Sequence, residues 1–342
     1  MTTAILEGAA LKGVAICVPD RIFDNIKDSD NFDPQEVKKV VTIAGIKRRR
    51  IVDANTCSSD LCRQAGKQLL EGLNWSPESI DALIFVTQTP DYFLPSTASL
   101  LHRDLELPTS CAAFDVGLGC SGYPYALWLA AMMIQTGGAK RVLVMHGETP
   151  SLFTHAKDRA TAMLFGDAGS ASALEQEGDD QWGFSLHSDG QGYKDLIIPG
   201  RGFREPQPEN DRNNYLHMNG ASLFNFTIQE VPLLIQNTLN LMRKNIDDID
   251  AFIFHQSNQF MMRHIAKKSG LPLEKTPMIL ADYGNAGGAS VPMTLCQHYR
   301  DKKPNSTETA MLLGYGVGRS WGSALMTIHP DTVYLQSEYT KH

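Results

Sequence analysis

The sequence lacks any uncharged apolar run of the roughly 18–20 residues that a membrane-spanning helix requires. Its N-terminal segment, residues 1–13, also lacks the basic stretch followed by a hydrophobic stretch that marks a signal peptide. An excess of basic residues is missing too, because the formal net charge is −7 at pH 7. These absences lead us to expect a cytoplasmic protein that neither enters a membrane nor binds nucleic acid through a general basic surface.

Cysteine is present, but without the spacing that builds metal or disulfide motifs. The six cysteines include no Cys-x-x-Cys pair and no zinc-like arrangement. An even number would permit disulfides, yet without an export signal reduced thiols are the expectation. Nothing in the sequence requires a metal ion or an organic cofactor, and we predict neither.

The chain does contain an internal repeat. Residues Ser79–Phe85 read Ser-Ile-Asp-Ala-Leu-Ile-Phe, and Asp248–Phe254 read Asp-Ile-Asp-Ala-Phe-Ile-Phe. A second pair, Phe165–Leu174 and Gly316–Leu325, shares a Gly-rich turn that leads into a strand of small residues. Because two pairs of similar segments in the same order favour duplication over chance, we predict two similar halves in this chain of 342 residues.

The two predicted halves, residues 1–176 and 177–342, alternate between strand-like and helix-like segments, which favours helices packed on mainly parallel sheets. Residues 123–134 are apolar on every side, so this helix should be wrapped on every side, as a position between two sheets would achieve. Residues 190–214, rich in Gly, Pro, Asn and charge, should form an inter-half connection or a surface loop. The expected strands are 82–87, 112–118, 141–146, 170–174, 251–255, 310–315 and 323–329. The expected helices are 58–72, 97–104, 123–136, 222–244, 259–269 and 290–300.

Cys120 has the most informative surroundings of any residue. It follows the apolar run 112–118 and precedes the uncharged helix, so we predict a sharp turn from strand to helix with the thiol on it. Backbone N–H groups at a helix start favour a thiolate and can also stabilise an oxyanion, which suits acyl transfer. A buried structural cysteine is the alternative that this motif alone leaves open.

Two further segments have a chemical character. His255 ends an apolar strand, where an imidazole can face a cleft, although a structural histidine is the commoner outcome. Asn285 lies in a Gly-rich turn, either as a simple connection or as an amide whose N–H₂ can hold a carbonyl oxygen. The segment Gly314–Gly318 is similarly either a bend or a source of backbone N–H donors.

Together these motifs resemble one family, β-ketoacyl-ACP synthase III of the thiolase superfamily (ACP, acyl carrier protein). Cys120 in Gly-Cys-Ser-Gly, His255 in His-Gln-Ser-Asn and Asn285 in Tyr-Gly-Asn follow the order of that family, as does the closing segment Gly314–Leu325. The likeness extends over residues 10–329 and implies an α/β thiolase fold. In that fold two duplicated halves stack in five αβαβα layers with buried central helices, and the protein is a homodimer whose site lies between the halves.

The resemblance also implies a role for each site residue. Cys120 would accept an acyl group from a thioester primer. His255 and Asn285 would bind the thioester carbonyl of malonyl-ACP as neutral donors and stabilise the enolate left by decarboxylation. The oxyanion hole of the family uses backbone N–H groups that correspond to Cys120 and Val317. Burial should lower the pKa of His255, which must be neutral during part of this cycle.

Several positions depart from the family pattern. Lys39 and Ile43 stand where relatives that use CoA primers carry Trp and Arg, which weakens acetyl-CoA as the primer and leaves another acyl-CoA or an acyl-ACP. Leu94 corresponds to a residue, often Phe, that reaches the acyl pocket of the partner subunit. The resemblance therefore implies an altered acyl pocket and a specialised primer.

Carrier docking and the loops of the site depart as well. Phe260 replaces a docking Arg, so docking would use basic residues further along the same helix. These are Arg263, Lys267 and Lys268. The basic run 47–50 is either a contact for phosphates or an acidic carrier, or a solvated turn. Ala-Gly-Gly follows Asn285 where Thr-Ser-Ala is usual, and Arg319 replaces an apolar residue.

Three functions stay open at this point. The first is a decarboxylating condensation with malonyl-ACP, in fatty-acid initiation or in a dedicated acyl pathway. The second keeps the fold but transfers the acyl group from Cys120 to an alcohol or amine, as the altered Asn285 loop and Arg319 would allow. The third is a silent subunit of a heterodimeric synthase, which an intact Cys-His-Asn set disfavours; a papain-like hydrolase needs another fold.

Overall fold

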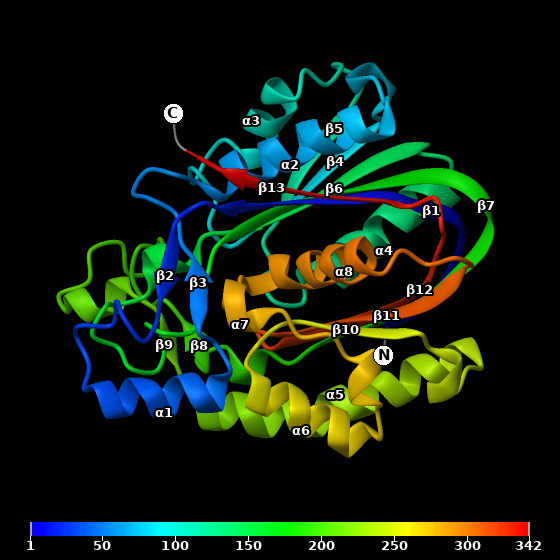
Figure 1. Cartoon of the computed structure of the whole chain (residues 1–342). Coiled ribbons are helices and arrows are strands. Elements are labelled where there is room, and N and C mark those ends of the chain that lie inside the picture. Colours follow the sequence, from blue (N-terminus) through cyan, green and yellow to red (C-terminus); the bar gives the residue numbers. More distant parts are fainter. Residues whose placement is uncertain (1, 341–342) are drawn as a thin grey trace.

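The computed structural model describes residues 2–340, and its elements stack in five layers (Figure 1). Helices α2 and α3 form one outer layer, α4 and α8 lie between two sheets, and α5 and α6 form the other outer layer. This stacking confirms the predicted α/β fold in five αβαβα layers.

The helices are α1 (Pro34–Ala44), α2 (Ser58–Leu73), α3 (Thr97–Asp104), α4 (Gly122–Gln135), α5 (Gly220–Met242), α6 (Gln259–Ser269), α7 (Leu280–Tyr283) and α8 (Ser290–Asp301). The strands are β1 (Thr2–Pro19), β2 (Ile22–Asp24), β3 (Arg48–Arg50), β4 (Ala82–Val86), β5 (Ala112–Val116), β6 (Arg141–Glu148), β7 (Ala168–Ser188), β8 (Leu196–Ile197), β9 (His217–Met218), β10 (Ala251–Phe254), β11 (Glu308–Gly316), β12 (Ser320–Ile328) and β13 (Val333–Tyr339).

Two long strands, β1 and β7, pass through both sheets and join them. One sheet has the order β5-β4-β6-β7-β1-β13, and the other has the order β10-β11-β12-β7-β1. Residues 168–175 of β7 pair with β6, whereas residues 183–188 pair with β12. Both strands bend where a glycine takes a positive φ, +82° at Gly8 and +67° at Gly178, a conformation that glycine adopts without steric cost.

The predicted boundary between the halves, at residues 176 and 177, falls in the exposed middle of β7 and not in a linker. The first part of β1 belongs to the sheet of the second half, and β13 belongs to the sheet of the first half. Each half therefore lends a strand to the other. The division into two units stays a prediction.

The repeated Ile-Asp-Ala segments occupy equivalent places in the two halves. Each leads into a parallel strand, β4 inside its sheet and β10 at the edge of the other. Asp81 accepts a hydrogen bond from the backbone N–H of Arg141 at 2.9 Å, and Asp250 accepts one from the backbone N–H of Thr309 at 2.8 Å. Each carboxylate thus fixes the start of the neighbouring strand, so the repeat in sequence is also a repeat in structure.

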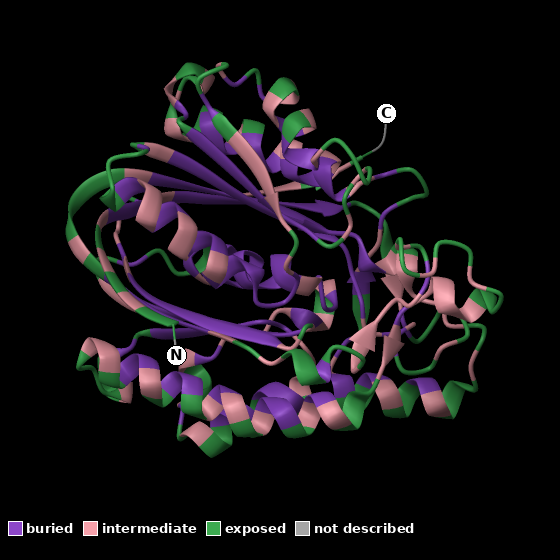
Figure 2. Ribbon diagram, turned by 180° about the vertical axis from the view of Figure 1, so that it is seen from behind, coloured by how far each residue is buried: buried purple, intermediate pink, exposed green. Residues whose placement is uncertain are grey.

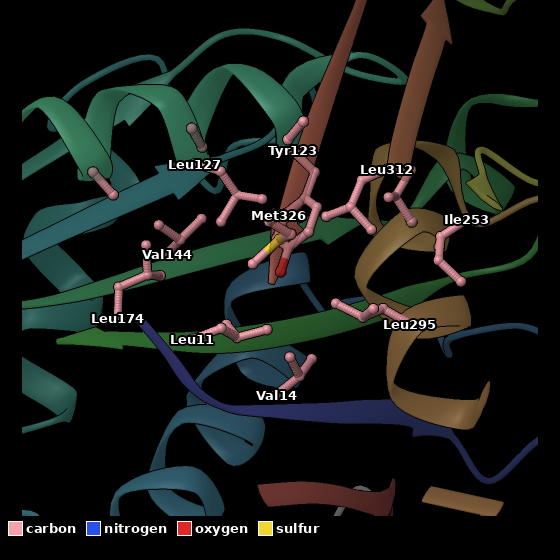
Figure 3. Close-up of a cluster of buried hydrophobic side chains, with 14 of the residues drawn as sticks. Leu11, Val14, Tyr123, Leu127, Val144, Leu174, Ile253, Leu295, Leu312 and Met326 are labelled. Carbon is pink, nitrogen blue, oxygen red and sulfur yellow. The ribbon is translucent and has the colours of Figure 1, made fainter. Parts of the chain in front are cut away.

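The largest apolar core surrounds the two middle helices. Figure 2 shows buried residues on both sheets and on the inward sides of the helices, with exposed residues on the outward sides. In Figure 3, Tyr123 and Leu127 of α4 and Leu295 of α8 point into one cluster with side chains from both sheets. The prediction that α4 lies between two sheets is confirmed.

The expectation that α4 is wrapped on every side is wrong for one of its faces. No element within residues 2–340 fully covers that face, although it is apolar. The half-buried residues of this face are Tyr125, Trp128, Leu129, Met132 and Met133. Strand β5, at the edge of its sheet, is also only half-buried over Ala113–Val116.

Two other expectations are decided by the chain path. The halves are linked by β7, so residues 190–214 are a surface segment and not the inter-half connection. The basic run is solvated only in part: Lys47 and Arg48 are exposed, with Arg48 paired to Asp282, whereas Arg49 is buried and bonded to Asn25. Between residues 2 and 340 we find no helix that is both long and apolar enough to cross a bilayer.

Candidate active site

Cys120 lies in the turn between β5 and α4, two residues before the helix begins at Gly122. The end of β11 approaches it so closely that a Cβ at Gly316 would lie 2.9 Å from the Cys120 sulfur, so only glycine leaves room there. The backbone N–H groups of Val317 and of Cys120 itself face the sulfur and lower its pKa. The two N–H groups predicted for an oxyanion hole are therefore brought to one atom.

Burial nevertheless determines the resting state of this thiol. Cys120 is 8% exposed, and burial raises its pKa to about 11 despite the two facing N–H groups. The prediction of a stabilised resting thiolate is wrong, because burial destabilises the thiolate by more free energy than the N–H groups at the helix start stabilise it. The proton must leave when substrate binds, which requires a base.

His255 follows directly after β10, as predicted, and its side chain is held on one side. Its Nδ1 lies 3.0 Å from the carbonyl oxygen of Gly287 and 2.9 Å from the hydroxyl of Ser290. A carbonyl oxygen can only accept, so Nδ1 carries the hydrogen and Nε2 keeps a lone pair. Burial lowers the pKa of His255 to about 4, with the nearby His146 adding to the effect, so the ring is neutral at rest.

Asn285 is fixed by both of its amide atoms and by its backbone. Its Oδ1 accepts the backbone N–H of Gly287 at 3.0 Å, which assigns the N–H₂ to the other side, where it lies 3.4 Å from the carbonyl oxygen of Ser257. The backbone forms a bridge with Phe165. The amide is thus presented as a donor.

The three predicted side chains meet at one cavity. Cys120, His255 and Asn285 all line a space of about 110 Å³, together with residues of α5, α6 and the end of β11. A second cavity of about 320 Å³ also borders Cys120, and Val317 and Glu148 line it. Leu196 borders both spaces, so the surface segment 190–214 has a part in the site that its composition did not reveal.

The peripheral residues predicted for the site lie outside these cavities. Leu94 is 79% exposed and lines neither cavity of its own chain. Three basic residues project from α6, whose first turn, at Met261, borders the smaller cavity. These are Arg263, Lys267 and Lys268.

Arg319 does not line either cavity. Its guanidinium donates to Asp195, Asp189 and Ser222, and so ties the Gly-rich turn after β11 to the segment around residue 195. Since the side chain is used in this way, its charge does not enter the site.

Sequence reasoning missed three parts of the site. Gly287 joins His255 to Asn285 through its own N–H and C=O, and a backbone role leaves no mark in a sequence beyond the glycine itself. His146 and Glu148 at the end of β6 are buried close to Cys120. Two ionisable residues at the end of an apolar strand were the available signal for them.

A buried cysteine at a strand-to-helix turn, facing a histidine and an asparagine within a two-sheet, five-layer fold, defines a thiolase-type protein that can carry an acyl group. Family models for 3-oxoacyl-[acyl-carrier-protein] synthase III match residues 114–190 and, for the C-terminal part, residues 240–328. A putative 3-oxoacyl-[acyl-carrier-protein] synthase 3 of Campylobacter jejuni is 36% identical, with 94% of each chain covered. The β-ketoacyl-[acyl-carrier-protein] synthase III of Clostridium perfringens is 33% identical and covered completely by 94% of this chain.

Solved structures agree with the sequence relatives. The 3-oxoacyl-(acyl-carrier protein) synthase of Burkholderia xenovorans superposes with a TM-score of 0.95 at 44% identity, over 99% of both chains. OleA of Xanthomonas campestris, at 20% identity over 95% of this chain and 98% of its own, has a TM-score of 0.84 and shares the fold. The chain belongs to the 3-oxoacyl-[acyl-carrier-protein] synthase III family.

Proposed function

We propose that the chain catalyses a decarboxylating condensation between an acyl thioester primer and malonyl-ACP, with Cys120 carrying the acyl group. The observation that carries this proposal is the shared cavity, where the sulfur, its two facing N–H groups, His255 and Asn285 meet. The names of the relatives, which are 3-oxoacyl or β-ketoacyl synthases, support the same reaction.

In the first half-reaction the sulfur attacks the primer carbonyl. The carbonyl oxygen becomes an oxyanion that accepts hydrogen bonds from the backbone N–H groups of Cys120 and Val317. The thiol proton moves to Nε2 of His255, because Nδ1 is already engaged by Gly287 and Ser290. The primer's own C–S bond then breaks, and its leaving thiolate takes a proton from water. Acyl-Cys120 and an imidazolium remain.

In the second half-reaction the malonyl thioester places its carbonyl oxygen between Nε2 of His255 and the amide nitrogen of Asn285. Loss of CO₂ leaves an enolate on that oxygen, which both donors stabilise. The carbanion attacks the acyl carbonyl, the bond from carbon to the Cys120 sulfur breaks, and the proton on His255 returns to the sulfur. In its resting tautomer the neutral ring offers no Nε2–H, so the proton taken from Cys120 supplies this donor, and the negative charge of the bound malonyl group must raise the pKa of His255 above its resting value of about 4.

The larger cavity is the proposed primer site. Its 320 Å³ equals roughly ten water-sized groups, which suits a short to medium acyl chain. Apolar side chains make up most of its wall. These are Pro150, Phe153, Phe165, Leu196, Ile197, Ile198, Leu216 and Val317. A specialised primer, on CoA or on ACP, remains our proposal, supported by this wall and by the departures at Lys39 and Ile43.

The carrier protein is proposed to dock on α6. The exposed Arg263, Lys267 and Lys268 give this helix a basic face next to the smaller cavity, and acidic carriers are attracted to such a face. A homodimer is proposed as well. The half-buried apolar face of α4, the edge strand β5 and the exposed Leu94 support it, because apolar surface of this extent favours association.

The transfer of an acyl group to an alcohol or amine has less support. It rested on Arg319, which is bonded to Asp195 and Ser222, and on the Ala-Gly-Gly segment after Asn285, which packs against β6. Neither feature creates room for a second kind of acceptor.

Purified protein, given malonyl-ACP and a panel of acyl-CoA and acyl-ACP donors, tests the proposal. We expect release of CO₂ with at least one primer and, in intact-protein mass spectra, the mass of that acyl group on Cys120. Cys120→Ser should remove the added mass. The proposal is wrong if no donor yields CO₂, or if acyl-Cys120 turns over equally well without any malonyl substrate.

A further inference from the structure

Two buried ionisable side chains at the end of β6, His146 and Glu148, have no chemical step in the proposed reaction, although Glu148 also lines the larger cavity. His146 and Glu148 are separated by one residue, so they project from the same face of the strand, toward the middle layer. Met145 and Gly147 project from the opposite face, toward α2, where they contact Gly66 and Cys62. The face that carries His146 and Glu148 is the one that looks toward Cys120.

These two side chains fill the space beneath the loop that follows Asn285. A Cβ at Gly288 would overlap the ring of His146, and a Cβ at Gly287 would lie 3.0 Å from Cγ of Glu148. The His146 ring also packs near the start of α4, where a Cβ at Gly122 would lie 3.1 Å from it. His146 is therefore wedged between the helix that follows Cys120 and the loop.

The loop in contact with this wedge holds both remaining site residues. The N–H of Gly287 bonds to Asn285, and the C=O of Gly287 bonds to His255. A displacement of Gly287 would move both side chains together relative to the sulfur.

His146 supports the loop through the volume of its side chain and not through hydrogen bonds of the imidazole. Neither ring nitrogen of His146 has a hydrogen-bond partner, and Nε2 lies 3.9 Å from Glu148. Burial lowers the pKa of His146 to about 3 and raises that of Glu148 to about 8, so both are neutral near pH 7. The carboxyl of Glu148 is fixed by the backbone N–H of Gln88 at 3.0 Å.

We propose that His146 and Glu148 are positioning residues, which hold Gly287 and Gly288 so that His255 and Asn285 face the Cys120 sulfur together. The pairing also explains why Ala-Gly-Gly follows Asn285 in this chain: the larger side chains of β6 occupy the room that larger residues in the loop would need. This inference rests on the proposed condensation, whose enolate both side chains bind.

Three single variants test the proposal: His146→Ala, His146→Met and, as a matched control, Met145→Ala. In His146→Ala we expect CO₂ release from the malonyl thioester to slow by about 10²-fold, the typical result of a 1 Å misplacement, while the final amount of acyl-Cys120 is unchanged. His146→Met should recover most of the rate, because a methionine side chain fills irregular gaps. Met145→Ala removes buried volume on the other face of the strand and should lower Tm to a similar extent without slowing CO₂ release.

Amide hydrogen exchange of residues 285–290 gives a readout that does not depend on catalysis. It should rise in His146→Ala and stay at the wild-type level in Met145→Ala. The proposal is overturned if His146→Ala keeps the wild-type rate of CO₂ release and wild-type hydrogen exchange. It is also overturned by a His146→Met variant as slow as His146→Ala, since the nitrogens would then matter, or by a Met145→Ala variant that slows equally. A wild-type protein without any CO₂ release would instead remove the proposed function, and the exchange result would still decide the positioning role.

Discussion

At the scale of single residues, Glu148 links the proton content of the site to the stability of the fold. Burial raises its pKa from 4.5 to about 8, against the opposing hydrogen bonds from Gln88 and Thr89. The folded protein therefore holds one proton more than the unfolded chain between these two pH values. By linkage, the stability that this group contributes is complete below pH 4.5 and is lost as the pH rises through 8.

Glu148→Gln keeps the shape and hydrogen-bonding capacity of the side chain but stays neutral at every pH. We expect the Tm of Glu148→Gln minus that of the wild type to increase by about 2 °C or more as the pH rises from 5 to 9. Thermal unfolding followed by fluorescence measures this difference. Glu274→Gln, which changes an exposed carboxyl, is the control and should show no such trend. A Tm difference that is independent of pH would contradict the neutral state of Glu148.

Asn285→Asp separates the donor role of the amide from its place in the loop. The carboxylate can still accept the N–H of Gly287, but it has no hydrogen to offer a substrate oxygen. We expect CO₂ release to fall by about 10²-fold or more, with acylation of Cys120 retained. Stopped-flow and mass measurements follow the two steps separately. Asn240→Asp on the exposed side of α5 should change neither step, and loss of both steps in Asn285→Asp would mean that the loop itself had moved.

The residues of the site were predictable to different degrees. Cys120, His255 and Asn285 lie where short motifs predicted them, at a strand-to-helix turn, at a strand end and in a Gly-rich turn. The protonation state of Cys120 was not predictable, because it depends on burial by β11, which is distant in sequence. The same holds for Gly287, whose backbone groups act only once the fold brings His255 beside them.

At the scale of secondary structure, local pattern identified the elements with one clear face or clear ends. All six expected helices are present, with ends within two residues of those expected. Helix α1 was missed although Asp33 caps its start and Gly45 ends it, because only three of its residues are buried. Strand β7 was predicted only in part, since its middle carries charges and glycine and resembles a turn. Strands that bend between two sheets, like β1, show no regular alternation to detect.

Helix α6 is the element on which carrier recognition is proposed to depend. Reversing two of its charges, in Arg263→Glu with Lys267→Glu, should raise KM for malonyl-ACP by about tenfold and leave KM for malonyl-CoA unchanged, because only the carrier protein is proposed to contact α6. The effect should shrink as salt is added, since exposed charges are screened. Steady-state kinetics with both substrates measures it.

The matched control for this helix is Lys67→Glu on α2, an exposed lysine in the opposite outer layer (Figure 1). It also makes the net charge more negative, but it lies on the other side of both sheets. If Lys67→Glu raised KM for malonyl-ACP as much per charge, the attraction would come from net charge and not from α6.

At the scale of the whole molecule, one chain leaves apolar surface uncovered around the edge of a sheet. The half-buried face of α4, the edge strand β5 and Leu94 all belong to the first half of the sequence, and no element within residues 2–340 covers them fully. A second copy of the chain would bury this surface, and light scattering in solution should give twice the mass of one chain. The sequence predicted the dimer only through its resemblance to a family, because uncovered surface becomes visible only after folding.

The dimer makes a specific prediction for Leu94, whose side chain lines neither of the two cavities beside Cys120 in its own chain. If it reaches the primer site of the partner subunit, Leu94→Trp should shift primer preference toward shorter acyl chains by about tenfold without lowering Tm.

A mixed dimer gives the stricter test. One chain carries Cys120→Ala with Leu94→Trp, and the other carries neither change, so the one working cysteine faces the tryptophan of the inactive chain. We expect this mixed dimer to prefer shorter primers, measured by competition between acyl donors and the mass on Cys120. Leu273→Trp, at an exposed leucine elsewhere on the chain, is the control. Wild-type preference in the mixed dimer would show that Leu94 acts within its own chain or not at all.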